Sequence, residues 1–163
     1  MTRGFANETQ TGNTVERYTP PHIFAALGLT FDLDPCAAPR HDYVPAINKY
    51  VLPADGLSLP WHGKIWLNPP YGRNMGAWLR RLASHKNGIA FVFARTDTRW
   101  WHETVATADI VCFVRGRVNF VNHKTGSGTL PANAPSVLIG WGEDCVEAIR
   151  SCNLGMCMEI IRD

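Results

Sequence analysis

Apolar runs alternate with amphipathic segments along this chain, and most apolar runs end in a polar or proline-containing turn. Short apolar runs bounded by turn residues are typical of strands in a sheet that is covered on both faces. Strands are therefore predicted over residues 29–33, 64–67, 89–93, 109–114 and 136–141, with a last edge element over 156–161.

Helical signals occupy the intervals between these runs. Thr19 is the expected N-cap of a first helix, with Pro20 in its first turn and Gly28 at its end. The helix over 75–85 has one apolar face and is closed by Gly88. Helices are predicted over residues 20–27, 46–50, 75–85, 100–106 and 143–150. Strands that alternate with helices predict a doubly wound α/β fold: a compact single sheet with helices on both faces and a site at the strand tips.

Composition indicates one globular domain. The 163 residues are 45% hydrophobic and 18% charged, which provides enough apolar surface for a packed core. We expect a single domain over residues 17–163 behind a polar, flexible leader over 1–16 that lacks the apolar segment of a signal peptide. No stretch is long enough to span a membrane. Because the net charge is only +2, a DNA-binding surface would depend on local clustering of the 16 basic residues.

The cysteines and histidines form no recognisable metal motif. The five cysteines include no C-x-x-C pair, and Cys112 lies in an apolar run, as expected of a core thiol. Cys145, Cys152 and Cys157 have no histidine at ligand spacing, so no metal site is predicted. The six histidines are scattered, and none is assigned a catalytic role. Free thiols in this number favour a reducing cytoplasm.

The segment Asn68-Pro69-Pro70-Tyr71 directly follows the apolar run over 64–67. Neither proline has an N–H to donate, so the strand must end there in a stiff turn. Asn68 Oδ1 and the Pro69 carbonyl can accept two N–H bonds, and the Tyr71 ring can stack on a planar heterocycle. The turn therefore suits a base with an exocyclic amine; a proline-stiffened loop without a ligand is the simpler alternative.

Two further turns contain a carboxylate. Asp34 follows a predicted strand and is succeeded by Pro35, Cys36 and Ala37, whose small side chains let the backbone approach a ligand closely. The Asp34 carboxylate can accept hydrogen bonds from a ribose hydroxyl or an ammonium group, and Asp55 can accept one from an adenine amine. An ordinary Asp-Pro turn and a tight Asp-Gly loop are the alternatives.

Arginines gather after two other predicted strands, within residues 95–99 and 115–117, and Trp100 and Trp101 follow the first group. Arginine forks suit phosphate, and tryptophan can stack on bases or wedge between them, although one of the two tryptophans is expected in the core. The polar loop over 122–133 is a candidate for base contacts. The candidate DNA-binding residues are Arg95, Thr96, Asp97, Arg99, Trp100, Arg115, Arg117, Asn119 and Lys124.

Together these segments resemble the phage-type DNA N6-adenine methyltransferase family, and the Asn-Pro-Pro-Tyr turn resembles motif IV of amino-methyltransferases. The matching blocks run in family order from residue 18 to residue 141. They are Tyr18-Thr19-Pro20, Leu33-Asp34-Pro35-Cys36-Ala37, Asp55-Gly56-Leu57 with Trp61, residues 66–72, residues 94–100, residues 115–120, and Ala134-Pro135-Ser136. The combination is more specific than the Asn-Pro-Pro-Tyr turn alone, which occurs in several methyltransferase classes.

The resemblance implies a Rossmann-like fold and methyl transfer from S-adenosylmethionine to a flipped-out adenine in double-stranded DNA, without a metal. It also implies a phage or prophage gene whose product acts in a bacterial cytoplasm. The implied catalytic residues are Asn68, Pro69, Pro70 and Tyr71. The implied cofactor-binding residues are Thr19, Pro20, Asp34, Pro35, Cys36, Ala37, Asp55 and Asn68. The glycine-rich cofactor loop of other methyltransferases is absent, and Asp-Pro-Cys-Ala-Ala-Pro stands in its place.

Three other interpretations remain open from the sequence. The same acceptors suit the amine of an RNA base or of a protein glutamine. A DNA-binding relative that has lost catalysis would keep the arginines. A purely structural phage protein is the third interpretation, and it leaves the polar clusters at the strand ends unexplained.

Overall fold

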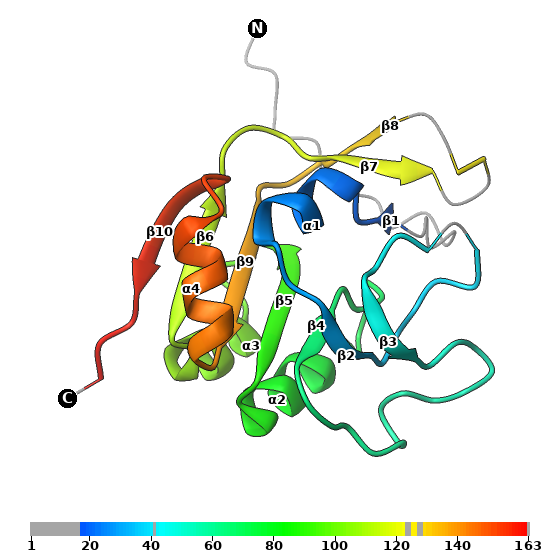
Figure 1. The fold of residues 1–163 in the computed structure, drawn as a ribbon. Coiled ribbons are helices and arrows are strands. Elements are labelled where there is room, and N and C mark those ends of the chain that lie inside the picture. Colours follow the sequence, from blue (N-terminus) through cyan, green and yellow to red (C-terminus); the bar gives the residue numbers. More distant parts are fainter. Residues whose placement is uncertain (1–16, 41, 123–124, 127–128, 163) are drawn as a thin grey trace, which may run out of the picture.

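The computed structural model describes residues 17–40, 42–122, 125–126 and 129–162 (Figure 1). The predicted leader over residues 1–16 lies outside the described residues. The strands are β1 Arg17–Tyr18, β2 Phe31–Asp34, β3 Ala46–Lys49, β4 Ile65–Leu67, β5 Gly88–Phe93, β6 Ile110–Val114, β7 Asn119–Asn122, β8 Thr129–Pro131, β9 Ser136–Trp141 and β10 Gly155–Glu159. The helices are α1 Pro21–Leu27, α2 Met75–His85, α3 Arg99–Thr104 with a 3-10 turn Val105–Thr107, and α4 Glu143–Ser151.

The main sheet is mixed and has seven strands in the order β10-β6-β9-β5-β4-β2-β3. Strands β3, β2, β4 and β5 are parallel, whereas β9 runs antiparallel to β5 and β6, and β10 antiparallel to β6. From β2 the chain goes to the β3 edge and returns through β4 on the opposite side of β2. This reversal makes the carboxyl ends of β2 and β4 a topological switch point, where ligands of open α/β sheets bind.

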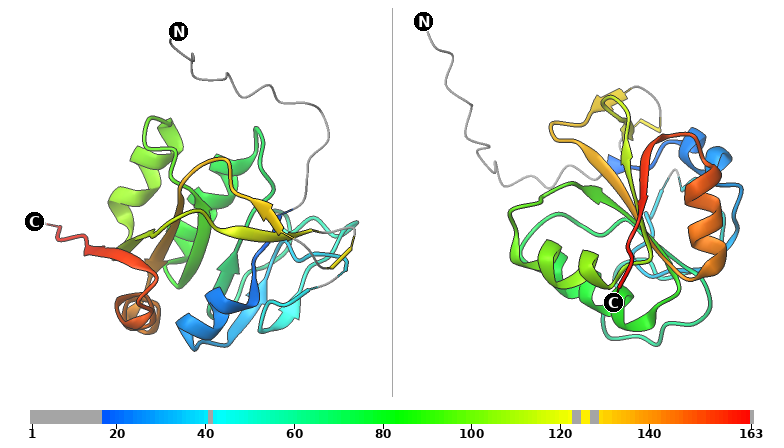
Figure 2. Two further views of the ribbon diagram at one scale, coloured as in Figure 1. Left: turned by 90° about the horizontal axis from the view of Figure 1, so that it is seen from above. Right: turned by 90° about the vertical axis from the view of Figure 1, so that its left-hand side faces the viewer.

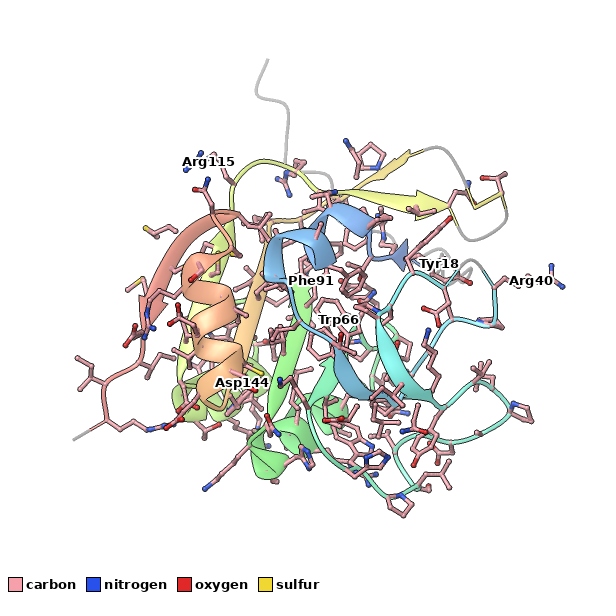
Figure 3. All side chains as sticks on the ribbon, viewed as in Figure 1. Tyr18, Arg40, Trp66, Phe91, Arg115 and Asp144 are labelled. Atoms are coloured by element: carbon pink, nitrogen blue, oxygen red, sulfur yellow. The ribbon has the colours of Figure 1, made fainter. Side chains whose placement is uncertain are left out.

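Helices cover both faces of the main sheet, as predicted (Figure 2). Helices α1 and α4 pack on one face, and α2 and α3 pack on the other. The Trp66 ring lies in the first core, with its centroid 4.7 Å from that of Phe24, 5.3 Å from Phe31 and 6.1 Å from Phe91. Figure 3 shows Trp66 and Phe91 in the interior of the molecule. These rings fix the position of β4, and therefore of the turn that follows it.

A second, three-stranded antiparallel sheet, ordered β1-β7-β8, corrects our expectation of a single sheet. We expected a loop over 122–133 and no strand over 115–120, but β7 and β8 pair with each other and β7 also pairs with β1. Phe120 anchors this sheet, since it is 1% exposed and packs on Phe91 and Phe93. Strands of two to four residues carry almost no periodic signal, so their pairing depends on this tertiary contact.

The helix predicted over residues 46–50 is wrong, because residues 46–49 form edge strand β3. Phe31 pairs with Ala46, and Leu33 with Asn48, in a parallel ladder. A helix of five residues closes too few internal hydrogen bonds to be stable by itself. The open edge of β2 offers the same backbone groups immediate partners, so the sheet takes this segment.

Two predicted helix boundaries also need correction. Pro20, not Thr19, occupies the N-cap of α1, and the helix begins at Pro21. Helix α2 ends at Lys86, whose φ of 61° is left-handed and whose N–H donates to Leu82 O, whereas Gly88 already belongs to β5. Thr19 does not cap α1 because its hydroxyl contacts the site described below. Gly88 does not close α2 because it is the first residue of β5.

The other predicted elements are confirmed, with boundaries within one or two residues for β4, α2, β5, β6, β9, α4 and the edge strand β10. The α2 face over Met75, Trp78, Leu79 and Leu82 is buried, as its spacing predicted. Within the described ranges, none of the helices is long and apolar enough to cross a membrane.

Candidate active site

The turns after β2 and β4 meet at the switch point. The Cys36 thiol donates to the Asn68 carbonyl oxygen at 3.3 Å. Burial, followed by the neighbouring Asp34 charge, raises the pKa of the Cys36 thiol, so the thiol keeps the proton that it donates. The sequence predicted that these two turns would share one sheet edge, and this contact confirms their proximity.

The Asn68 side-chain amide is held in one orientation. Its Nδ2 donates to the Arg17 carbonyl at 3.0 Å and to Thr19 Oγ1 at 3.2 Å. Because the Arg17 carbonyl can only accept, the nitrogen of the amide must face β1 and Oδ1 must face away from it. The small second sheet therefore orients the side chain that follows the main sheet's β4.

Two acceptors remain available on this turn. Within the described part of the chain, no donor reaches Asn68 Oδ1 or the Pro69 carbonyl. Pro69 is buried and Pro70 is exposed. Acceptors held in place and not used by the fold can bind N–H groups of a ligand without first breaking an internal bond.

Tyr71 uses one ring face for packing. Its ring stacks on Phe93 with centroids 4.6 Å apart and an interplanar angle of 28°. The Tyr71 hydroxyl is buried with no hydrogen-bond partner among the described residues. Burial raises the pKa of the phenol, against the opposing charges of Arg17 and Arg95, so the hydroxyl is neutral. The ring face that stacks on Phe93 is therefore not available to a ligand.

Two arginines lie beside this aromatic pair. The guanidinium of Arg17 lies 5.7 Å from the Phe93 ring centroid and 5.9 Å from that of Phe120, and the Arg95 guanidinium lies 5.9 Å from Phe93. Arg95 was among the predicted DNA-binding residues. Arg17 was not, because a single arginine in a two-residue strand has no distinguishing pattern. Positive charge therefore lies next to the Asn68–Tyr71 turn.

Asp34 is a buried carboxyl group at the end of β2, with 3% of its surface exposed. Burial raises its pKa to about 7, and Asp42 adds to the rise, while the Cys36 N–H bond and Lys49 oppose it. Its Oδ1 accepts the Cys36 N–H at 3.0 Å, and no donor from the described residues reaches Oδ2. A cation or a hydroxyl donor bound at Oδ2 would stabilise the ionised form.

The loop that contains Asp55 packs beside the Asp34 turn. Asp55 accepts the Leu57 N–H at 3.0 Å and the Ser58 hydroxyl at 2.5 Å, and the Ser58 bond is the main cause of its lowered pKa. Both carboxylate oxygens therefore support the turn itself. The structure shows no further partner for Asp55 within the described residues, so its predicted cofactor contact stays a prediction.

Arg81 of α2 holds this loop in place, a role that the sequence did not reveal. Its guanidinium donates to the carbonyls of Gly56, Leu57 and Leu59, and it lies 4.7 Å from the Trp61 ring centroid. The only sequence signal is an arginine on the polar face of an amphipathic helix, which is common for solvent-exposed residues.

The remaining predicted DNA-binding residues lie farther along the chain. Arg115 and Arg117 are exposed after β6, whose carboxyl end shares the sheet edge with those of β4 and β5. Figure 3 shows Arg115 at the opposite end of the molecule from Asp144. Arg99 pairs with Glu103 at 2.5 Å on its own helix. Thr96, Asp97 and Asn119 are exposed, and Lys124 lies outside the described residues.

Trp101 is buried and Trp100 half-buried, which confirms that one tryptophan belongs to the core.

Two cavities of the structure lie away from this turn. A cavity of about 820 Å³ is lined by residues of α2, α3 and the end of β9, at the amino edge of β5. Its cationic residues include Arg80, paired with Glu103 at 2.7 Å, and Arg162, paired with Asp109 at 2.5 Å. A second cavity of about 560 Å³ lies along α4. Neither of these two cavities is lined by Asn68 or Tyr71.

Comparison with known families agrees with this chemistry. Residues 8–152 match the family model described as DNA N-6-adenine-methyltransferase (Dam). The chain belongs to the Dam family. No curated protein and no solved structure gives a significant match. Membership indicates DNA adenine methylation as the general activity of this Dam-family chain.

The Asp34 carboxyl should make stability pH-dependent. Its folded pKa of about 7 lies above the ordinary value of 3.8, so the folded state binds more protons between these two values. The free energy of unfolding therefore falls as pH rises through this window, by up to about 1.4 kcal/mol per pH unit, and is level above it. Asp34→Asn should abolish this component, measured by urea unfolding from pH 4 to pH 8. Asp97→Asn, an exposed control, should keep it, and equal pH profiles for the wild type and Asp34→Asn would contradict the assignment.

Gly56 allows the two loops to touch. A Cβ at this position would lie 1.7 Å from the Pro35 carbonyl oxygen, so Gly56→Ala must push the Asp34 turn away. We expect a loss of about 1–3 kcal/mol in the free energy of unfolding. Ser58→Ala, on the exposed side of the same loop, should cost less than about 1 kcal/mol. Urea unfolding of the two variants measures the difference, and similar values would show that the contact is loose.

Proposed function

We propose that this Dam-family chain transfers a methyl group from S-adenosylmethionine to the N6 amine of an adenine that has left double-stranded DNA. The observation that supports this most directly is the orientation of Asn68. Its Nδ2 is committed to Arg17 and Thr19, while Oδ1 and the adjacent Pro69 carbonyl are left as acceptors. An exocyclic amine has two N–H groups, and two neighbouring acceptors match them.

These acceptors favour the transition state over the bound substrate. As the N6 lone pair leaves conjugation and bonds to the methyl carbon, the S–CH3 bond breaks, positive charge develops on the nitrogen, and its N–H groups become stronger donors until one proton is lost. Asn68 Oδ1 and the Pro69 carbonyl then bind them more tightly than in the planar ground state. The two prolines and the bonds of Asn68 to β1 hold the acceptors still, so little reorganisation is needed when the base arrives.

The β2 turn is the proposed cofactor site. When bound, S-adenosylmethionine supplies an electrophilic methyl group on a sulfonium centre. The buried Asp34 carboxyl fits this cationic ligand, because its free Oδ2 can accept a ribose hydroxyl or pair with an ammonium. Pro35, Cys36 and Ala37 present small side chains or backbone beside it. The switch-point topology is the arrangement expected of the Rossmann-like fold that we assign to the main sheet.

Adenine N6 lies within the base stack of duplex DNA, so the base must leave the helix before reaching Asn68. The ring face of Tyr71 that is turned away from Phe93 is the proposed stacking surface. Arg17 and Arg95, whose guanidinium groups lie beside Phe93, are the proposed contacts to the phosphates that flank the displaced nucleotide. Arg115 and Arg117 extend positive charge along the same sheet edge.

The decisive experiment is methyl transfer from labelled S-adenosylmethionine to duplex DNA, with RNA and Asn68→Ala tested in parallel. Asn68→Ala should lower turnover by ~10²-fold or more, because it removes a preorganised polar contact to the amine. Cofactor binding, measured by calorimetry, should survive. Label in N6-methyladenine that disappears in the variant would establish both the reaction and the residue.

The other outcomes separate the alternatives. Label in RNA alone would support methyl transfer to an amine but identify RNA, not DNA, as the substrate. Cofactor binding without label in either nucleic acid would favour a protein glutamine as acceptor. A protein that binds DNA but not S-adenosylmethionine would be a non-catalytic relative. Unchanged turnover in Asn68→Ala would refute the assigned mechanism.

Thr19 should act as a positioning residue for Asn68. Thr19→Val keeps the shape but removes the acceptor at 3.2 Å from Nδ2, so the amide can rotate. We expect kcat to fall about 5-fold, since one hydrogen bond contributes about 1 kcal/mol. The KM values for DNA and cofactor should stay unchanged. Thr19→Ser restores the hydroxyl and should recover most of the activity; a Ser variant as slow as Val would show that only packing matters.

The Tyr71 ring, not its hydroxyl, should matter for base capture. The hydroxyl is buried without a partner in the described residues, so Tyr71→Phe removes an unsatisfied group and should leave both stability and turnover near wild type. Tyr71→Ala removes the stacking surface and should weaken DNA binding by ~10-fold or more. Fluorescence anisotropy with DNA that contains a mismatched adenine measures the DNA affinity of both variants. Urea unfolding and the methyl-transfer assay measure the stability and turnover of Tyr71→Phe. Equal losses in the two variants would assign a role to the hydroxyl.

A further inference from the structure

Three cysteines converge near the β10 edge of the main sheet, away from the Asn68 turn. Cys112 lies in β6, and Cys157 is its direct partner in the antiparallel β10. Cys152 is the C-cap residue of α4, which packs on the same face. Their three sulfur atoms all lie within 4.8 Å of one another. Residues 40 positions apart in the chain are therefore brought together by strand register and helix packing.

These separations suit a common metal ligand sphere. With metal–sulfur bonds of about 2.3 Å, three sulfurs around one ion lie about 4.0 Å apart in a plane, or about 3.8 Å apart as corners of a tetrahedron. The observed spacing therefore requires only small side-chain adjustments. Among the described residues, no fourth cysteine, histidine or carboxylate joins the group. Three sulfur donors without a nitrogen or oxygen ligand favour a soft cation, and Zn²⁺ usually requires four ligands.

The surroundings support deprotonated sulfur once a cation is present. The Leu154 N–H donates to Cys152 Sγ at 3.5 Å, a contact that strengthens when the sulfur carries negative charge. The Cys157 thiol donates to the Ile149 carbonyl at 3.3 Å, and that carbonyl also accepts the Cys152 N–H at 3.3 Å. When Cys157 loses its proton, the Ile149 carbonyl therefore still accepts the Cys152 N–H. Cys157 is only half-buried, which gives an ion a route from solvent.

Two of the three thiols, those of Cys112 and Cys152, favour the protonated form when no cation is bound. Burial raises the pKa of Cys112 and of Cys152 above the ordinary thiol value. Cys145, which lies on α4, is also buried and does not belong to this group of three sulfurs. It is therefore a matched control for a cysteine that serves only as a small core residue.

We propose that Cys112, Cys152 and Cys157 bind one soft, thiophilic cation, with monovalent copper as the best match to three sulfur donors. Binding releases three protons as Cu⁺ + 3 RSH → [Cu(SR)₃]²⁻ + 3 H⁺, with no change of oxidation state. The ion would join β6, β10 and the end of α4, and so fasten the last strand of the sheet. This site is independent of the methyl-transfer proposal.

The test is anaerobic titration of the full chain with Cu⁺, delivered from its coloured bicinchoninate complex, in the presence of a phosphine reductant. Wild type and Cys145→Ala should each withdraw one equivalent and gain thermal stability. Cys157→Ser should weaken the affinity by at least ~10-fold, since it removes one of three ligands. Zn²⁺ measured in the same way should bind more weakly than Cu⁺.

Several outcomes would overturn the proposal. These are no uptake by the wild type, full affinity in Cys157→Ser, an equal loss in Cys145→Ala, or tighter binding of Zn²⁺. If Cys157→Ser does not fold, as judged by circular dichroism, X-ray absorption of the copper-loaded wild type decides. Three sulfur neighbours without nitrogen or oxygen support the site, and any other ligand set refutes it.

Discussion

The hydrogen bonds from Asn68 Nδ2 to the Arg17 carbonyl and to Thr19 are the interaction on which the organisation of the site depends. They connect the two sheets at the point where β4 ends. They also decide which atom of the amide is used by the fold and which is left for a ligand. A strand of only two residues, β1, thereby determines the orientation of the most important side chain in the proposed mechanism.

Around this connection, the site combines rigid and unsatisfied groups. The prolines and the Phe93 stack make the turn stiff, while Asn68 Oδ1, the Pro69 carbonyl, the Tyr71 hydroxyl and Asp34 Oδ2 lack partners within the described residues. Of these groups, the Tyr71 hydroxyl is fully buried, and an unpaired buried polar group reduces stability. The raised pKa of Asp34 is one consequence of this arrangement.

Much of the fold was predictable from local pattern. The continuous apolar runs predicted β4, β5, β6 and β9, and the helical spacing predicted α2 with its buried face, because burial on a sheet imposes these periods directly. The errors lie where local preference is weak. Residues 46–49 became a strand because the edge of β2 was available, and β1, β7 and β8 are too short for any period to show. The candidate turn was predictable for a similar reason: prolines act on their own backbone, whatever surrounds them.

By itself, the sequence determined the Asn-Pro-Pro-Tyr turn, the carboxylate after β2 and the order of the main elements, since these depend on residues close together in the chain. Only the tertiary structure decided how Asn68 is oriented, which face of Tyr71 is covered, that Arg81 holds the Asp55 loop, and that three cysteines meet. Each of these depends on a contact between residues far apart in the chain. Such contacts are set by strand order and register, which no local pattern of residue types specifies.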